Sequence, residues 1–154
     1  LMPEVKAGVR SVNYVPNPNF SGTDTFTVQI QDNNADVQKA GEDSLTINIV
    51  IKPVNDLPTL TAPAIFPVKG GVPATFDVTV GDVETPVANL VVTCAGSGSS
   101  FPKGSITLTG TGTTRTVHLS PSATTKITTS SLTLTVTDGN KGHASAKVAV
   151  TVSP

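Results

Sequence analysis

The sequence has few of the residues on which several functions depend. It has one cysteine, no tryptophan and only 4% aromatic residues. A single cysteine excludes a disulfide framework within the chain, so its core or a metal must stabilise the fold. Charged residues make up 14% of the chain and the formal net charge is −1. This balance excludes the clustered basic surface that binds nucleic acid or an anionic membrane.

Long apolar runs are also missing. None approaches the ~20 residues that a membrane-spanning helix needs, so we expect no membrane insertion. The first ten residues, LMPEVKAGVR, lack the basic head and apolar core of a signal peptide. Because the chain also opens within a strand pattern, we expect it to be a fragment or a processed product.

The sequence contains no recognisable catalytic or zinc-binding set. His118 and His143 stand alone, without the three or four spaced ligands of a zinc site. The stretch GTGTTR (110–115) resembles part of a phosphate loop, but no helix follows it, so we interpret it as a β-turn. Cys94 lies in an alternating run, where a buried, inert thiol is the simplest interpretation. The chain is therefore predicted not to be an enzyme.

The residues that are abundant indicate an all-β chain. Threonine, valine, isoleucine and leucine are frequent, and 13 glycines and 12 prolines separate alternating segments. No apolar pattern with the helical period persists over ten residues. A short strand is predicted near PEVKA (3–7) and an edge strand within 59–68, where Pro63 and Pro67 interrupt the pattern. The other predicted strands are 8–15, 24–31, 44–51, 74–80, 89–95, 105–110, 114–120, 131–137 and 145–152.

The region from Pro58 onward matches an immunoglobulin-like sandwich. It has seven predicted strands in 97 residues, as that fold requires. The segment TDGNKG (137–142) is the predicted hairpin turn between the last two strands, because Asp138-Gly139 is a strong tight-turn signal. Alternation predicts a core made of Phe76, Val78, Val80, Leu90, Val92, Cys94, Leu132, Leu134, Val136, Val148, Val150 and Val152.

Longer motifs resemble two repeat families of large bacterial surface or secreted proteins. GDVETPVANLVVT, GSITLTGTGTTRTVHLSPSA and LTLTVTDGNKGHASAKVAVTV, within 74–152, resemble a bacterial Ig-like repeat. NYVPNPNFSGTDTFTVQIQD followed by PVNDLP, within 12–58, resembles the second half of a bacterial cadherin-like repeat. The resemblance implies a partial sandwich at 1–52, a linker at 53–58 and a complete seven-stranded sandwich at 59–154.

The acidic residues are concentrated near the predicted junction of the two domains. Seven of eleven lie in the first 56 residues, and most of the eleven fall in loops. Alternate loops of a sandwich share one end, so we expect the loops around residues 82–84 and 138 to face the entering linker. The predicted cluster comprises Asp24, Asn55, Asp56, Asp82, Glu84 and Asp138.

This convergence predicts a calcium site. Calcium takes six to eight oxygen ligands, and strand-end loops supply carboxylates and carbonyls. Carboxylates packed together without a cation would repel one another. The arrangement also resembles the calcium-bound junctions between cadherin repeats. Taken singly, Asp24, Asp138 and the Asn55-Asp56 pair are better explained as ordinary turn formers.

The expected function is structural. We interpret the chain as a spacer or adhesin-like repeat of an extracellular or bacterial cell-surface protein, rigidified by calcium. The alternative is a carbohydrate- or protein-binding module that uses the loop GSGSSFP (96–102) with an exposed Phe101, and so has a glycan or protein receptor. Because the partial first domain leaves the strand 24–31 uncovered, we expect strands of neighbouring repeats or copies of the chain to complete it and build fibres.

Overall fold

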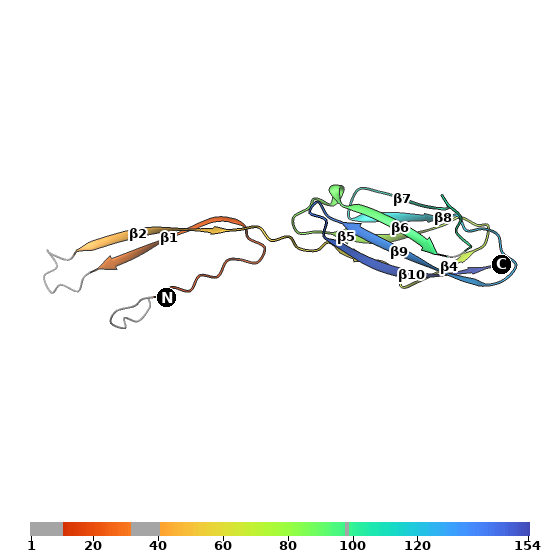
Figure 1. Ribbon diagram of the computed structural model, residues 1–154, viewed down its shortest axis with the longest axis horizontal. Helices are drawn as coiled ribbons and strands as arrows, with labels where there is room; N and C mark the ends of the chain where they lie inside the picture. Colours follow the sequence, from red (N-terminus) through yellow and green to blue (C-terminus); the bar gives the residue numbers. More distant parts are fainter. Residues whose placement is uncertain (1–10, 32–40, 98) are drawn as a thin grey trace. The chain divides into compact units, whose positions relative to one another are not determined.

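The computed structural model describes residues 11–31, 41–97 and 99–154 of the 154-residue chain. The chain divides into two compact units, Leu1–Val54 and Asn55–Pro154. The first contains a two-stranded sheet and the second contains two four-stranded sheets (Figure 1).

The described part of the first unit is dominated by one long hairpin. Strands β1 (Gly22–Gln31) and β2 (Glu42–Ile51) pair antiparallel, with Gly22 opposite Ile51 and Gln31 opposite Glu42. Both predicted strands are thus confirmed, each starting two residues earlier. Directly paired residues share a face, so one face of the ladder is apolar. It carries Phe26, Val28, Ile30, Leu45, Ile47, Ile49 and Ile51.

Two other strands predicted in the first unit had different outcomes. Residues 11–15, the second half of the predicted strand 8–15, are not in a strand, so that prediction is wrong for the described residues. This segment has Pro16 and Pro18 immediately downstream, and prolines cannot donate to a sheet ladder. The short strand predicted near residues 3–7 lies outside the described residues.

The second unit is a sandwich of two four-stranded sheets. One sheet has the order β3-β5-β8-β7 and the other the order β4-β10-β9-β6. Neighbouring strands are antiparallel, except that β4 pairs parallel with β10, from Ile65 opposite Ala149 to Lys69 opposite Ser153. The strands are β3 (Thr59–Thr61), β4 (Ile65–Lys69), β5 (Ala74–Gly81), β6 (Val91–Ser97), β7 (Ile106–Thr109), β8 (Thr114–Leu119), β9 (Thr128–Thr137) and β10 (His143–Ser153).

The first predicted strand of this unit is in fact two strands. The stretch 59–68 splits around Pro63 into β3 and β4, which belong to different sheets. Both are edge strands, as the prolines predicted. The sandwich therefore has eight strands where seven were predicted. A single 3-10 turn, η1 (Val87–Asn89), is the only helical element among the described residues.

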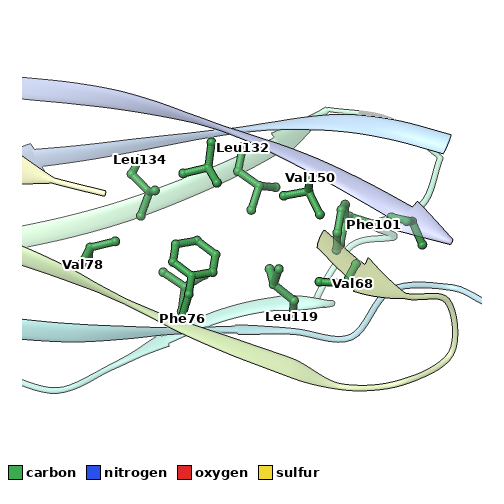
Figure 2. Close-up of a cluster of buried hydrophobic side chains, with 11 residues drawn as sticks. Val68, Phe76, Val78, Phe101, Leu119, Leu132, Leu134 and Val150 are labelled. Atoms are coloured by element: carbon green, nitrogen blue, oxygen red, sulfur yellow. The ribbon is translucent and has the colours of Figure 1, made fainter. Parts of the chain in front are cut away.

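The core lies between the two sheets, as alternation predicted. Figure 2 shows Leu132, Leu134 and Val150 of one sheet facing Phe76, Val78 and Leu119 of the other. Of the predicted core residues, Val92 and Cys94 are only half-buried and the rest are buried. The core also includes residues that were not predicted, namely Val68, Phe101, Val117 and Leu119.

The turn at residues 110–115 is fixed by a buried arginine. The interpretation of GTGTTR as a β-turn agrees with the structure, since it joins β7 to β8. Gly110 has φ 96°, and a Cβ there would lie 2.8 Å from the Thr114 carbonyl oxygen, so glycine is required. Arg115 is 4% exposed and donates to the carbonyl oxygens of Gly112 and, at 2.7 Å, Val87. It thereby ties the turn to η1.

Candidate functional site

Five of the six predicted calcium ligands lie in the second unit, where hydrogen bonds link them. We call this set, with Asn140, the entry-loop cluster. Three chain segments contribute to it: the first residues of the unit, the loop after β5 and the hairpin between β9 and β10. Its members are Asn55, Asp56, Asp82, Glu84, Asp138 and Asn140.

Asp138 is the most fully bonded carboxylate of the cluster. Its Oδ1 accepts hydrogen bonds from the backbone N–H groups of Asn140 (2.8 Å) and Gly142 (2.7 Å), and its Oδ2 accepts one from Asn55 Nδ2 (2.8 Å). The hydrogen bond from Asn55, supported by the backbone donors, lowers the pKa of Asp138 against the opposing effect of burial. Asp138 is therefore ionised at neutral pH.

The hairpin that carries Asp138 has its loop within the predicted turn segment 137–142. Its position between the last two strands is confirmed. The Asp138 N–H donates to the Gly142 carbonyl at 3.0 Å, so the loop closes over five residues. The left-handed residue is Lys141, with φ 73°, and not a member of the Asp138-Gly139 pair.

Asn55 joins the start of the unit to this hairpin. Besides donating to Asp138, its Nδ2 donates to the Asp56 carbonyl at 2.9 Å, and its Oδ1 accepts from Asn140 Nδ2 at 2.6 Å. Gly142 gives the amide room, because a Cβ there would lie 2.9 Å from Asn55 Nδ2. The amide therefore uses both its donor and its acceptor to hold the entering chain.

Asp82 and Glu84 form the second half of the cluster. Asp82 Oδ1 accepts from the backbone N–H groups of Glu84 (3.0 Å) and Thr85 (2.6 Å), which makes an Asx-type turn. Glu84 Oε2 accepts from the Asp56 N–H at 3.1 Å. Asp82 Oδ2 is buried and has no hydrogen-bond partner. A buried carboxyl oxygen without a hydrogen-bond partner costs free energy unless something binds it.

The geometry of the cluster partly fits a cation. Within residues 11–31, 41–97 and 99–154, no group of three or more His, Cys, Asp or Glu side chains is arranged to hold a metal. Hydrogen bonds from backbone and side-chain amides already reach four of the eight carboxylate oxygens, so the argument that packed carboxylates need a cation is weaker than the sequence suggested. Asp82 Oδ2 is the one buried oxygen of the cluster that lacks a hydrogen-bond partner.

Asp24, the sixth predicted ligand, belongs to the other unit. It was expected in a loop but lies within β1, opposite Ile49 on the apolar face. Its Oδ2 accepts from the Tyr14 hydroxyl at 2.9 Å, and its Oδ1 accepts from the Thr25 N–H at 2.8 Å. The strand begins at Gly22, two residues earlier than predicted, so Asp24 is its third residue rather than its first.

The loop after β6 differs from its predicted role. Phe101 was expected to be an exposed ligand platform, but it is 9% exposed and belongs to the core, because this loop crosses from one sheet to the other. The prediction of an exposed Phe101 is therefore wrong. Beside it lies a small groove of about 180 Å³, lined by Cys94, Gly96, Phe101, Pro102, Lys103, Gly104 and Ile106. Burial raises the pKa of the Cys94 thiol, which stays protonated at neutral pH.

Comparisons with known proteins agree with this architecture. The family model described as "Bacterial Ig domain" matches residues 4–50. Titin domain M7 superimposes with a TM-score of 0.50 and 16% identity, over 66% of this chain and 99% of that one. Domains 4 and 5 of the S-layer protein SbsC align with a TM-score of 0.44 and 21% identity, over 87% of this chain and 59% of that one. None of the curated proteins matches the chain.

These findings define the class of fold. The likeness to the titin domain shows an immunoglobulin-like β-sandwich, which confirms the predicted all-β immunoglobulin-like fold. The family match confirms the resemblance to bacterial Ig-like repeats, and it falls on the segment whose motifs we compared with cadherin-like repeats. In the described part of the chain, no helix is long and apolar enough to cross a membrane.

Proposed function

We propose that the chain is a structural spacer segment of a bacterial cell-surface or secreted protein, rigidified by calcium. One observation carries the proposal: a segment that matches the bacterial Ig domain is followed directly by a complete immunoglobulin-like sandwich. Consecutive sandwiches on one chain are a means of spacing, since each unit adds length without needing chemistry.

The spacer role is testable on a cell surface. One, two or three tandem copies of the full chain would be displayed on bacteria, with a fluorescent tag at the outer end and a dye in the membrane. We expect the height of the tag above the membrane to rise with each copy. An unchanged height would contradict a spacer role, whatever the outcome for calcium.

Calcium binding at the entry-loop cluster is the finer part of the proposal. Three features support it. They are the unpartnered buried oxygen of Asp82, the exposed carboxylates of Glu84, which is bonded to Asp82, and of Asp56, which is bonded to Glu84, and the ionised state of Asp138. Asp82 and Glu84 would hold the ion, with Asp56 and Asp138 completing the oxygen set, and Asn55 would contribute through its amide oxygen. The ion would supply only charge neutralisation and cross-linking of three chain segments.

Thermal unfolding of the full chain with calcium or with chelator tests this directly. A ligand that binds only the folded state stabilises it by RT ln(1 + [L]/Kd), about 2.7 kcal/mol at a hundredfold excess over Kd. We therefore expect the Tm of the second unit to rise with calcium. Asp82→Asn should remove the rise, because it takes the charge from the unpartnered oxygen.

The matched control is Asp77→Asn. Asp77 is exposed on β5 and accepts a hydrogen bond from Thr116, outside the cluster. This variant should keep the calcium response. A Tm that is the same in calcium and in chelator would rule out the calcium proposal, while the spacer role would be judged by the display experiment alone.

The strand-pairing proposal concerns the hairpin of the first unit. Strands β1 and β2 pair only with each other among the described elements, and a two-stranded sheet is marginal by itself. We propose that strands from neighbouring repeats or copies pair with this hairpin. Sedimentation of the full chain over a range of concentrations tests it, and a strict monomer throughout would contradict it.

A further inference from the structure

The sandwich has four edge strands, and three of them are poor templates for strand addition. Strand β3 has three residues, β7 has four, and β4 contains Pro67. Short strands and prolines are the usual protection of sheet edges. The fourth edge strand, β6 (Val91–Ser97), has seven residues, VVTCAGS, with neither a charge nor a proline.

The edge of β6 is open to solvent. Among the described elements the strand pairs with β9 alone. On the outer face of its sheet, Val91 is 60% exposed, and Thr93 and Ala95 are also exposed. An edge strand of this kind carries a row of backbone donors and acceptors that no neighbouring strand pairs.

The groove beside Phe101 lies next to this edge. It is formed where β6 approaches β7, the edge strand of the opposite sheet, since a Cβ on Gly96 would lie 2.6 Å from Ile106 Cδ1. Strand addition uses backbone hydrogen bonds for affinity and a neighbouring pocket for alternate side chains. Strand β6 and the groove together supply both.

We propose that the edge of β6 accepts strand β2 of a second copy of this chain, paired antiparallel to it. This inference rests on the strand-pairing part of the proposed function and names the surface that it uses. In the hairpin, β2 has β1 on one side and no partner strand on the other among the residues that the structure describes. It offers ten residues, more than enough to match the seven of β6.

Charge complementarity selects this occupant and this direction. Lys103 is the only charged residue that lines the groove, and it follows the C-terminal end of β6. In an antiparallel pair, the N-terminal end of the added strand lies beside the C-terminal end of β6. Strand β2 begins with Glu42 and Asp43, and Asp43 is exposed, so its carboxylate would approach Lys103.

Such a contact joins different surfaces of the two copies. A heterologous contact does not close on itself unless the rotation happens to form a ring, so copies would add in an open series. The β6 edge of the last copy and the hairpin of the first would remain available. The expected product is a concentration-dependent series of oligomers, which extends to filaments.

The experiment is sedimentation of the full chain and its variants over a range of concentrations. Ala95→Glu places a negative charge on the exposed side of β6, near the acidic start of an added β2, and we expect it to weaken association at least tenfold. Thr75→Glu is the matched control, because Thr75 is exposed on β5 in the opposite sheet, where it pairs with His118 of β8. The control should associate like the unmodified chain, and circular dichroism would show that both variants remain folded.

A charge swap identifies the occupant. Lys103→Glu and Asp43→Lys should each weaken association, and the double variant should restore most of it. Cys94 gives a second readout, because it lines the groove and is the only cysteine. Its alkylation at alkaline pH should be slower in the associated chain than in Ala95→Glu at the same concentration.

The outcomes separate this inference from the proposal on which it rests. If the unmodified chain associates but Ala95→Glu and Lys103→Glu associate equally well, the role of β6 is wrong and strand pairing occurs elsewhere. The role of β6 is also wrong if the charge swap fails to restore association. If the unmodified chain is monomeric at every concentration, both this inference and the strand-pairing proposal are wrong.

Discussion

The two units use the same kind of strand but bury it very differently. In the sandwich, Leu134 of β9 and Val150 of β10 are 0% exposed. In the hairpin, Ile30 of β1 and Leu45 of β2 are 57% and 61% exposed, although they alternate with polar residues in the same way. The comparison shows that alternation specifies a strand and a face, whereas burial requires a second layer for that face to pack against.

Core truncation should have the largest effect and should separate the two units most clearly. Leu134→Ala removes a fully buried side chain, so we expect it to destabilise the second unit by about 2–5 kcal/mol. Leu45→Ala, its counterpart in the hairpin, should leave the unfolding of the second unit unchanged. Denaturant unfolding of the full chain measures both. Equal losses would mean that the two units unfold together.

Arg115 is a buried charge held by hydrogen bonds, and the described residues of the hairpin contain no such feature. Arg115→Met keeps much of the side-chain volume but removes two hydrogen bonds from a buried guanidinium. We expect a loss of roughly 1.5–3 kcal/mol in the free energy of unfolding, because hydrogen bonds to charged groups are the stronger ones. Lys147→Met, at an exposed position of β10, is the control and should change little. If the two substitutions lower the free energy of unfolding equally, the hydrogen bonds of the buried arginine do not stabilise the fold.

Gly142 tests how tightly the entry-loop cluster is packed. An added Cβ would contact Asp138 Oδ2 and lie 2.9 Å from Asn55 Nδ2, so Gly142→Ala should cost about 1–3 kcal/mol through forced displacement. Gly139→Ala is the matched control in the same hairpin, since its Cβ would meet only Thr85 Oγ1, at 3.8 Å. Thermal unfolding compares the two. A harmless Gly142→Ala would show that Asn55 can move away freely.

The smallest expected effect is a dependence of stability on pH. The pKa of Asp138 is lowered from its ordinary 3.8, chiefly by the hydrogen bond from Asn55. A carboxyl whose folded pKa is depressed stabilises the fold above its unfolded pKa, and this contribution is lost as the pH falls through the folded value. The second unit should therefore lose stability below about pH 3.8, and Asn55→Ala should reduce that loss. Chemical unfolding at a series of acidic pH values measures it, and identical curves for the two proteins would exclude the Asn55–Asp138 bond as its cause.

The strands and the core could be predicted from the sequence because they depend on local alternation. Val136 and Val148, for example, are buried where the period-two pattern places them. Arg115 and Phe101 could not be predicted, because their burial depends on which loops cross between the sheets. An arginine on a strand normally indicates a solvated position, and only the neighbouring carbonyls of Gly112 and Val87 reverse that expectation.

The candidate site was predictable in part: the sequence predicted which loops of the second unit meet, but it missed Asn140, included Asp24 of the first unit, and gave no bonding. Sandwich topology correctly placed Asp138, Asn55 and Glu84 at the same end of the second unit. Whether a carboxylate faces a cation or an amide depends on side-chain torsions and on hydrogen bonds such as those of Asn140. The sequence pattern carries no information on these. The unpartnered oxygen of Asp82 is likewise visible only in three dimensions.

The parallel pairing of β4 with β10 determines how the second unit would respond to a pulling force on its two ends. Tension draws β4 back through its N-terminal end and β10 forward through its C-terminal end, so these parallel strands are pulled in opposite directions. The hydrogen bonds of the whole ladder, from the Ile65–Ala149 pair to the Lys69–Ser153 pair, are then loaded in shear at the same time. In the hairpin, the chain enters at Gly22 and leaves at Ile51, which face each other, so the same force opens the ladder one pair at a time. The hairpin should therefore yield at a much lower force than the sandwich.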